Sequence, residues 1–243
     1  MDIIVLIKQT VDMDQIKLND SNEAMTENLP LKTDILSKNA IEAAVQLKEK
    51  YGGNVTGIIF GTEKATSSMK EAYAMGVDDG YIIKGYEKSD PLITSKVLSD
   101  KIKTVKNDLI ILGNQSSDSY SGLLQGLLAS ELNVSLLSNA IKIEINNGNV
   151  DVTTESENKD IIMESPLPAI ISVAQEINEP RLPNVMKIMA AGKKNINIED
   201  ADIKYEDDDK TLSNKAPENK RKKIVYEDNN GIDEIAKILR VVK

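Results

Sequence analysis

The 243-residue sequence contains no cysteine, histidine or tryptophan, and aromatic residues make up only 3% of it. Without cysteine the chain can form no disulfide and offers no thiolate, either as a nucleophile or as a ligand for an iron–sulfur cluster. Without histidine it lacks the usual general base and the commonest metal ligand. These absences exclude most familiar kinds of catalytic site. Because there is a single phenylalanine, isoleucine, valine, leucine and alanine must fill the core.

Positive charge and long hydrophobic runs are also scarce. The 30 basic residues are outnumbered by 39 acidic ones, and the net charge of −9 disfavours nonspecific binding to nucleic acid or to anionic membranes. No stretch approaches the roughly 20 apolar residues that span a bilayer, and the first apolar run, Ile3 to Ile7, is shorter than a signal peptide requires. We therefore expect a cytoplasmic protein that binds no nucleic acid and does not insert into membranes.

Short apolar runs alternate with helical patterns along most of the chain, whose length suits one large α/β domain. The runs are continuously hydrophobic, which is typical of strands buried on both faces of a parallel sheet. Their order predicts a doubly wound, mostly parallel, Rossmann-like sheet with right-handed crossovers. Strands are expected at Ile3–Ile7, Val55–Phe60, Tyr81–Ile83, Leu109–Leu112 and Ala169–Val173, and helices at Ser37–Tyr51 (capped by Ser37 and ended by Gly52-Gly53), Lys64–Met75, Pro91–Val105 and Ser121–Leu132.

One turn signal interrupts this alternation. Ile141–Ile145 and Val150–Thr154 flank the dipeptide Asn147-Gly148, which is a strong predictor of a two-residue hairpin turn. The parallel sheet is therefore expected to carry an antiparallel hairpin.

The composition changes near the C-terminus. We place the α/β nucleotide-binding domain at residues 1–198 and an extended C-terminal arm at residues 199–243. The arm contains an acidic cluster at 206–209, a basic cluster at 220–223 and a terminal helical pattern from Asp233 to Val242. Such a segment buries little surface alone, so it is either a solvated linker or an arm that folds on a partner.

A polar loop follows the apolar run Leu109–Leu112. It begins at Gly113, continues from Asn114 to Gly122, and leads into a helical pattern. In open parallel sheets such strand-to-helix crossings bind ligands, because backbone N–H groups and the positive end of the helix can receive a phosphate without a basic side chain. The alternative is a solvated serine-rich turn. The loop lacks the glycine-lysine ending of a P-loop and the three glycines of the dinucleotide fingerprint, which favours a nucleotide held by backbone groups without hydrolysis.

A second unusual segment runs from Ile177 to Lys187. It contains two prolines and Arg181, one of only three arginines in the chain, and is predicted to be a stiff, exposed loop. An ordinary ordered turn is one interpretation. Contact with a partner is the other interpretation, because exposed apolar side chains such as Leu182 and Met186 would otherwise favour aggregation.

Several short motifs together point to one protein family. They are Ile7-Lys8-Gln9, Ala40–Glu49, Ala72–Gly76, Gly113-x-Gln115-x-x-Asp118, Leu167-Pro168-Ala169 and Asn178-Glu179-Pro180-Arg181 followed by Leu182-Pro183-Asn184. Through these motifs the chain resembles the β subunit of electron transfer flavoprotein over residues 1 to 198, as a divergent member. We expect divergence because Asp34–Leu36, Tyr120 and Thr154–Lys159 depart from the usual pattern of that family.

The resemblance implies a heterodimer in which an α subunit holds a redox-active FAD and this subunit holds AMP or a second FAD. Flavin dehydrogenases or ferredoxin would exchange electrons with it, and no catalytic residues are expected. Met13 would approach the flavin of the partner. Docking to redox partners would use Arg181, Leu182, Pro183 and Met186. The nucleotide site would use Leu6, Asp34, Ile35, Leu36, Ser37, Phe60, Gly113, Asn114, Gln115, Ser116, Ser117, Asp118, Ser119, Tyr120, Ser121, Gly122, Leu123 and Leu124.

Two other functions fit the same predicted sheet. A nucleotide-binding sensor that resembles universal stress proteins would work as a homodimer, and an ATP-using enzyme would transfer adenylyl or phosphoryl groups. The missing glycine-rich phosphate motif counts against the enzyme. The acidic arm and the proline-stiffened loop around Leu182 favour the electron carrier over both.

Overall fold

The computed structural model describes residues 1–86, 90–157, 159–202, 212–217, 224–225 and 230–241. The chain divides into two compact units. Unit 1 comprises Met1–Ile16 and Thr26–Thr211, and unit 2 comprises Lys17–Met25 and Leu212–Lys243. The domain boundary predicted after residue 198 stays a prediction. The acidic and basic clusters at 206–209 and 220–223 lie outside the described residues.

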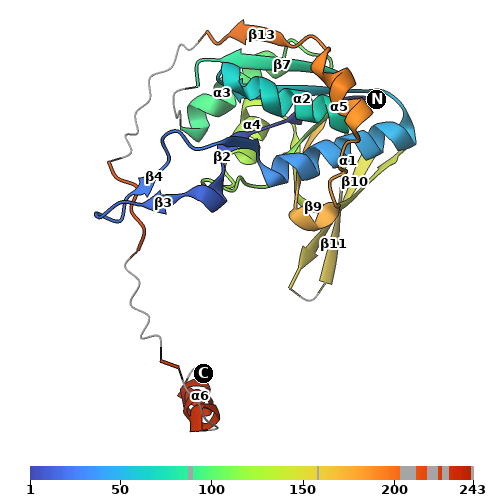
Figure 1. Cartoon of the computed structure of the whole chain (residues 1–243). Coiled ribbons are helices and arrows are strands. Elements are labelled where there is room, and N and C mark those ends of the chain that lie inside the picture. The colour runs from blue at the N-terminus through green and yellow to red at the C-terminus, as the bar shows by residue number, and fades with distance from the viewer. Residues whose placement is uncertain (87–89, 158, 203–211, 218–223, 226–229, 242–243) are drawn as a thin grey trace. The chain divides into compact units, whose positions relative to one another are not determined.

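Unit 1 is built on a sheet whose described strands follow the order β11-β10-β9-β12-β8-β1-β6-β7-β13. All neighbours from β9 to β13 are parallel, whereas β10 pairs antiparallel with both β9 and β11. The doubly wound sheet and the antiparallel hairpin at Asn147-Gly148 are therefore confirmed (Figure 1). The strands are β1 (Asp2–Leu6), β6 (Asn54–Gly61), β7 (Asp79–Lys84), β8 (Leu109–Gly113), β9 (Ser135–Asn146), β10 (Asn149–Ser156), β11 (Lys159–Pro166), β12 (Ala169–Val173) and β13 (Asn197–Asp200).

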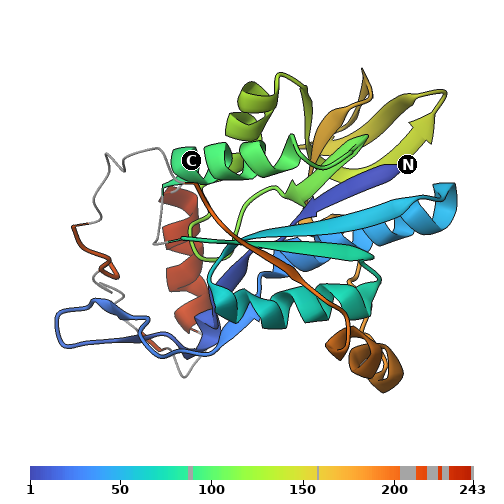
Figure 2. The same ribbon diagram turned by 90° about the horizontal axis from the view of Figure 1, so that it is seen from above.

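Helices cover both faces of this sheet, and the core is divided accordingly. Helices α1 (Ile35–Tyr51), α2 (Thr66–Met75) and α5 (Val185–Gly192) contribute to one apolar cluster. Helices α3 (Pro91–Ile102) and α4 (Leu124–Leu132) contribute to the other, and Figure 2 shows α3 and α4 on the face opposite to α1 and α2. Shorter elements are β2 (Gln9–Val11), which pairs antiparallel with β5 (Leu31–Thr33), and the 3-10 turns η1 (Met13–Gln15), η2 (Glu63–Ala65) and η3 (Gln175–Ile177).

The central strands lie where the hydrophobic runs predict them. Ile3 of β1 pairs with Val55 of β6 on one side and with Leu109 of β8 on the other, and all three side chains are buried. Strands enclosed on both faces need apolar residues at every position. The continuous runs therefore identified β1, β6, β8 and β12 correctly.

Three helix starts differ from the prediction. Helix α2 begins at Thr66 rather than Lys64, because the 3-10 turn η2 occupies the residues before it. Helix α1 begins at Ile35 with Asp34 as its cap, whereas Ser37 was predicted to be the cap. The Ser37 hydroxyl instead accepts a hydrogen bond from the backbone N–H of Lys8. Helix α4 begins at Leu124 rather than Ser121, because Tyr120 and Gly122 have left-handed φ values of 50° and 62° that a right-handed helix cannot include.

The short strands and the 3-10 turns were not predicted, and neither were three larger elements of unit 1. Strand β11 extends the hairpin to a third antiparallel strand, β13 adds a parallel edge strand beside β7, and α5 begins at Val185 inside the segment expected to be a loop. The exposed strand β13 has no continuous apolar run, so its sequence gives little signal. Among the described residues, no helix combines the length and apolar character needed to cross a membrane.

The described residues of unit 2 form a small antiparallel pair and one helix. Strand β3 (Lys17–Leu18) pairs with β4 (Ala24–Met25), and Glu23 forms an antiparallel bridge with Lys215. Helix α6 (Asn230–Val241) confirms the helical pattern predicted near the C-terminus. Its Ile232, Ile235, Ile238 and Leu239 are exposed. Whether residues 199–243 are a linker or an arm that folds on a partner stays a prediction.

Candidate functional site

The predicted nucleotide residues lie where the winding of the sheet reverses. From β1 the chain proceeds outward through β6 and β7, and then returns to place β8 on the other side of β1. Ligands of open α/β sheets bind at such switch points, beyond the carboxyl ends of the strands. Leu6 ends β1 and Gly113 ends β8, so the loops that follow them lie at this position.

Asp34 joins the start of α1 to the loop after β8. One carboxylate oxygen accepts hydrogen bonds from the backbone N–H groups of Leu36 (3.0 Å) and Ser37 (3.3 Å). The other accepts from the backbone N–H (2.8 Å) and the hydroxyl (2.6 Å) of Ser117. Only 1% of Asp34 is exposed. The carboxylate is therefore both a helix cap and a fixed attachment point for the loop.

A lysine from the end of β1 reaches the same loop. The Lys8 ammonium donates to the hydroxyl of Ser116 at 3.0 Å and to the carboxylate of Asp118 at 2.7 Å. Burial alone would raise the pKa of Asp118, but the bonds from Lys8 and Ser116 outweigh it and hold that pKa below its ordinary value. Asp118 is therefore an anion paired with Lys8.

The last part of the loop is shaped by residues in the left-handed region. Gly122 adopts a φ of 62°, and the side chain of Gln125 donates to the carbonyl oxygens of Asn114 and Gly122. No side chain caps the start of α4 at Leu123. Its first N–H groups have no intrahelical acceptors, so they form a site suited to an anion.

Two buried side-chain oxygens beside this helix start receive no hydrogen bond from the described residues. Among the described residues, nothing donates to the side-chain oxygen of Asn114 or of Gln125. Buried polar atoms normally have hydrogen-bond partners. Ligand hydroxyls or ordered water would supply them, so the residues present fit a polar, phosphate-bearing ligand.

A glycine allows the loop to approach α1 closely. A Cβ atom added to Gly113 would lie 2.7 Å from the Cβ of Leu36 and 3.1 Å from the carbonyl oxygen of Gln115. Real Cβ atoms do not come that close to other heavy atoms. The contact between the end of β8 and the first turn of α1 therefore requires glycine.

The remaining predicted residues surround this loop in different environments. Leu6 is buried in the core on the α3 and α4 face, whereas Ile35, Tyr120 and Leu123 are exposed. Phe60 meets the ring of Tyr86 edge to face, with 5.4 Å between centroids. Burial and the nearby charge of Asp118 raise the pKa of Tyr86. Met13 lies in η1 and is partly exposed.

Three residues near the loop were not in the predicted set. Lys8 was named only among the residues that carry the family resemblance, and Tyr86 was not predicted. Asn139 was also missed, although its side-chain oxygen accepts a hydrogen bond from Asn114 at 3.0 Å. Asn139 belongs to β9, far from the loop in sequence, so no local pattern could reveal it.

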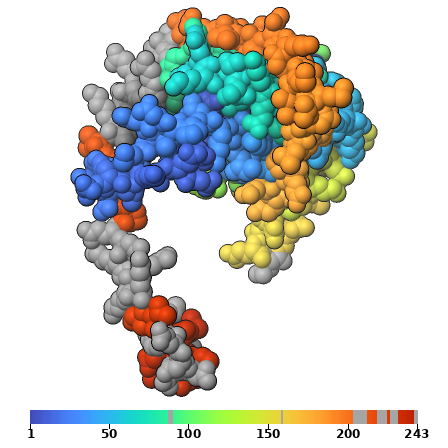
Figure 3. All heavy atoms as spheres, viewed as in Figure 1, coloured from blue at the N-terminus to red at the C-terminus, as the bar shows by residue number. Residues whose placement is uncertain are grey.

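The predicted docking residues divide into two kinds. Leu182 and Met186 are 95% and 81% exposed, and Figure 3 shows this part of the chain (orange) on the surface of unit 1. The Arg181 guanidinium instead turns toward α1, where it pairs with Glu42 and Glu49. The segment therefore presents these apolar side chains outward and its arginine toward α1.

Known proteins have sequences similar to this one over most of its length. A family model of the electron transfer flavoprotein domain matches residues 26–204. The electron transfer flavoprotein subunit beta of Mycobacterium tuberculosis strain H37Rv is 34% identical over 223 residues, which cover 87% of this chain and 84% of that protein. The corresponding subunit of Bacillus subtilis strain 168 is 30% identical over 213 residues, which cover 85% and 83%. The chain therefore belongs to the electron transfer flavoprotein family, as a β subunit.

Proposed function

We propose that this β subunit binds an adenine nucleotide, either AMP or a second FAD, at the loop from Gly113 to Leu124. Together with an α subunit that holds the redox-active FAD, it would carry electrons between flavin dehydrogenases or ferredoxin and an acceptor. When bound, FAD supplies the electron-accepting chemistry. The β subunit would bind, orient and dock, without catalytic residues of its own.

The observation that carries the nucleotide proposal is the uncapped start of α4 beside a loop tied down by Asp34. The carboxylate fixes Ser117 to the first turn of α1, so the loop is held before any ligand arrives. A pre-organised loop with free backbone donors favours phosphate oxygens. The side chains of Asn114 and Gln125 leave oxygens available for ligand hydroxyls.

Family membership distinguishes this proposal from the two other functions considered. A β subunit of an electron transfer flavoprotein works with an α subunit and a flavin, which favours the electron carrier over a homodimeric sensor. The same membership gives no support to adenylyl or phosphoryl transfer. The identity of the nucleotide is the point that needs an experiment.

Nucleotides released by denaturing the heterodimer test the proposal directly. Chromatography with absorbance detection would quantify FAD and AMP per heterodimer. One FAD and one AMP support a carrier with a structural AMP, and two FADs support a second flavin in this subunit. Release of ATP alone, or of no adenine nucleotide beyond one FAD, would contradict the proposed site.

Replacing Gly122 by valine is expected to reduce nucleotide occupancy. A β-branched residue at a φ of 62° is strained by about 1–2 kcal/mol, and its side chain would stand where the ligand approaches the backbone. Gly148 has a φ of 85° in open space at the hairpin turn, so Gly148→Val is the matched control for strain. The site assignment fails if both variants retain the same nucleotide content.

Replacing Leu182 by serine is expected to weaken docking to redox partners. An apolar anchor at a protein interface contributes about 2 kcal/mol, so the KM for a flavin dehydrogenase should rise about 30-fold with little change in stability. Leu212 is equally exposed, at 95%, so Leu212→Ser is the control. An unchanged KM for Leu182→Ser would remove this segment from the docking surface.

A further inference from the structure

The exposed docking segment is held at both ends by polar contacts that lead back to the same helix. We call residues 178–195 the docking segment. Between its ends the side chains of Leu182, Val185, Met186, Ile188 and Met189 are exposed, and Ala191 is the residue of α5 that enters the core. Helix α5 packs against α2 but buries only this one residue, so polar contacts at the two ends also determine the position of the segment.

The first end is fixed by arginine and asparagine. Arg181 donates from Nε and Nη2 to the two carboxylate oxygens of Glu42 at 2.7 and 3.0 Å. It donates from Nη1 and Nη2 to those of Glu49, also at 2.7 and 3.0 Å. Just before it, Asn39 donates to the backbone carbonyl of Asn178 at 2.9 Å and Asn178 donates back to the carbonyl of Asn39 at 3.0 Å. All three partners, Asn39, Glu42 and Glu49, lie on α1.

The pKa directions agree with this geometry. Burial alone would raise the pKa of Glu42, but the bonds from Arg181 and Gln46 outweigh it and hold that pKa below the ordinary value. The bonds from Arg181 likewise lower the pKa of Glu49. Guanidinium has five N–H donors, and four bonds to these carboxylates leave little capacity for a partner protein.

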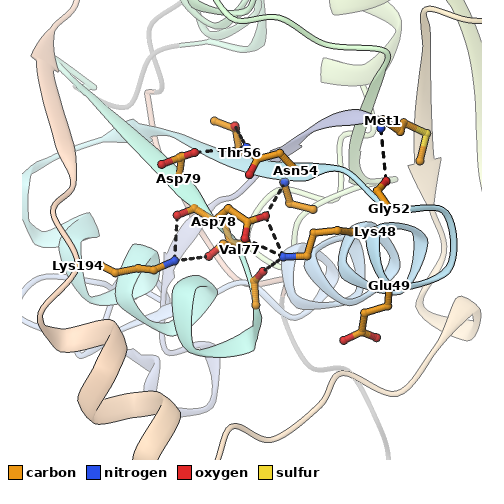
Figure 4. A network of polar contacts seen from close by, with 12 residues as sticks. Met1, Lys48, Glu49, Gly52, Asn54, Thr56, Val77, Asp78, Asp79 and Lys194 are labelled. Carbon is orange, nitrogen blue, oxygen red and sulfur yellow. Dashed lines mark hydrogen bonds and ion pairs between the residues drawn. The ribbon is translucent and has the colours of Figure 1, made fainter.

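The second end is fixed through the turn between α2 and β7 (Figure 4). The Lys194 ammonium donates to the carbonyl oxygens of Val77 (3.1 Å) and Asp78 (2.9 Å). The carboxylate of Asp78 in turn accepts hydrogen bonds from Lys48 of α1 at 2.8 and 2.9 Å and from the backbone of Val55. The second end is therefore also tied to α1, through Lys48.

We propose that Arg181, Glu42 and Glu49 are positioning residues that hold the docking segment in the geometry that redox partners recognise, and that the Arg181 guanidinium does not itself contact the partner. This inference rests on the proposed docking function of Leu182. Holding the exposed residues in place before binding reduces the conformational entropy lost on association. Glu42, only 3% exposed, can influence docking only through the residues that it holds.

Hydrogen exchange of the intact heterodimer tests the anchoring. Arg181→Ala, Arg181→Lys and Glu42→Gln are each expected to speed amide exchange in 179–192 by about 10- to 100-fold, because lysine cannot bind two carboxylates as the guanidinium fork does. Glu49→Gln tests the same anchor at a half-exposed residue, in case Glu42→Gln disturbs folding. Lys193→Ala removes a positive charge from an exposed position of the same segment and should leave exchange unchanged. Wild-type exchange in all four anchor variants would overturn the proposal.

Steady-state reduction of the heterodimer by a purified flavin dehydrogenase tests whether this anchoring affects docking. The anchor variants are expected to raise KM about 3- to 10-fold with kcat preserved, and reduction by dithionite, which needs no docking, should be unchanged. If Arg181→Ala raises KM while Arg181→Lys and Glu42→Gln do not, Arg181 contacts the partner and the inference is wrong, although the docking function survives. If Leu182→Ser leaves KM unchanged, the docking function fails and the inference falls with it.

Discussion

Asp34→Ala is expected to lower the free energy of unfolding by about 3–4 kcal/mol and to empty the proposed nucleotide site. The buried carboxylate accepts four hydrogen bonds from three residues, Leu36, Ser37 and Ser117. Loss of a helix cap costs about 1 kcal/mol, and each donor left buried without an acceptor adds about 1–3 kcal/mol unless water reaches it. Denaturant unfolding measures the first effect and nucleotide quantification the second.

Asp90→Ala provides the matched control. Asp90 also caps a helix, by accepting from the backbone N–H of Ile93 at the start of α3, and no other hydrogen bond is recorded for its side chain among the described residues. We expect it to lose about 1 kcal/mol and to retain the nucleotide. Equal losses of stability in the two variants would show that the bond from Asp34 to Ser117 contributes nothing beyond capping.

The strand pattern was sufficient to predict where the candidate site lies. The apolar runs that form β1 and β8 are buried on both faces, so hydrophobicity alone was enough to locate these strands. The loop beginning at Gly113 was then predicted from the position where the second run ends. Chain order then indicated a doubly wound sheet, whose switch point lies beside β1. Those steps depend on local sequence and on general rules of chain winding.

The details that hold the site together could not be predicted in the same way. Asp34 was included only through the family resemblance, because a carboxylate that bonds to Ser117, 83 positions away, leaves no local signal. Similarly, an arginine beside two prolines suggested an exposed partner contact, whereas its acceptors Glu42 and Glu49 lie 139 and 132 residues earlier in the chain. Contacts between distant segments become visible only when the sheet brings them together.

Helix α1 emerges as the element that connects the two proposed functional regions. Its cap at Asp34 holds the nucleotide loop, and Glu42 and Glu49, further along the same helix, hold Arg181 of the docking segment. A helix is rigid over such a distance because every turn is hydrogen-bonded. Substitutions that shift the start of α1 are therefore expected to matter more than substitutions in the exposed part of the loop.

Gly113→Ala tests that expectation at the closest contact between the loop and α1. The added methyl group would lie 2.7 Å from the Cβ of Leu36 and 3.2 Å from its carbonyl carbon, so the first turn of α1 or the end of β8 must move. Overpacking of this kind costs about 1–3 kcal/mol.

The displacement should also separate the backbone groups that we propose receive phosphate, so we expect nucleotide content to fall together with stability. Gly192 lies at the end of α5 with nothing within 4 Å of an added Cβ, and Gly192→Ala should be neutral or stabilising by about 0.4–1 kcal/mol with full nucleotide content. Normal stability and nucleotide content in Gly113→Ala would mean that α1 and the loop move independently, and that Asp34 alone does not fix their spacing.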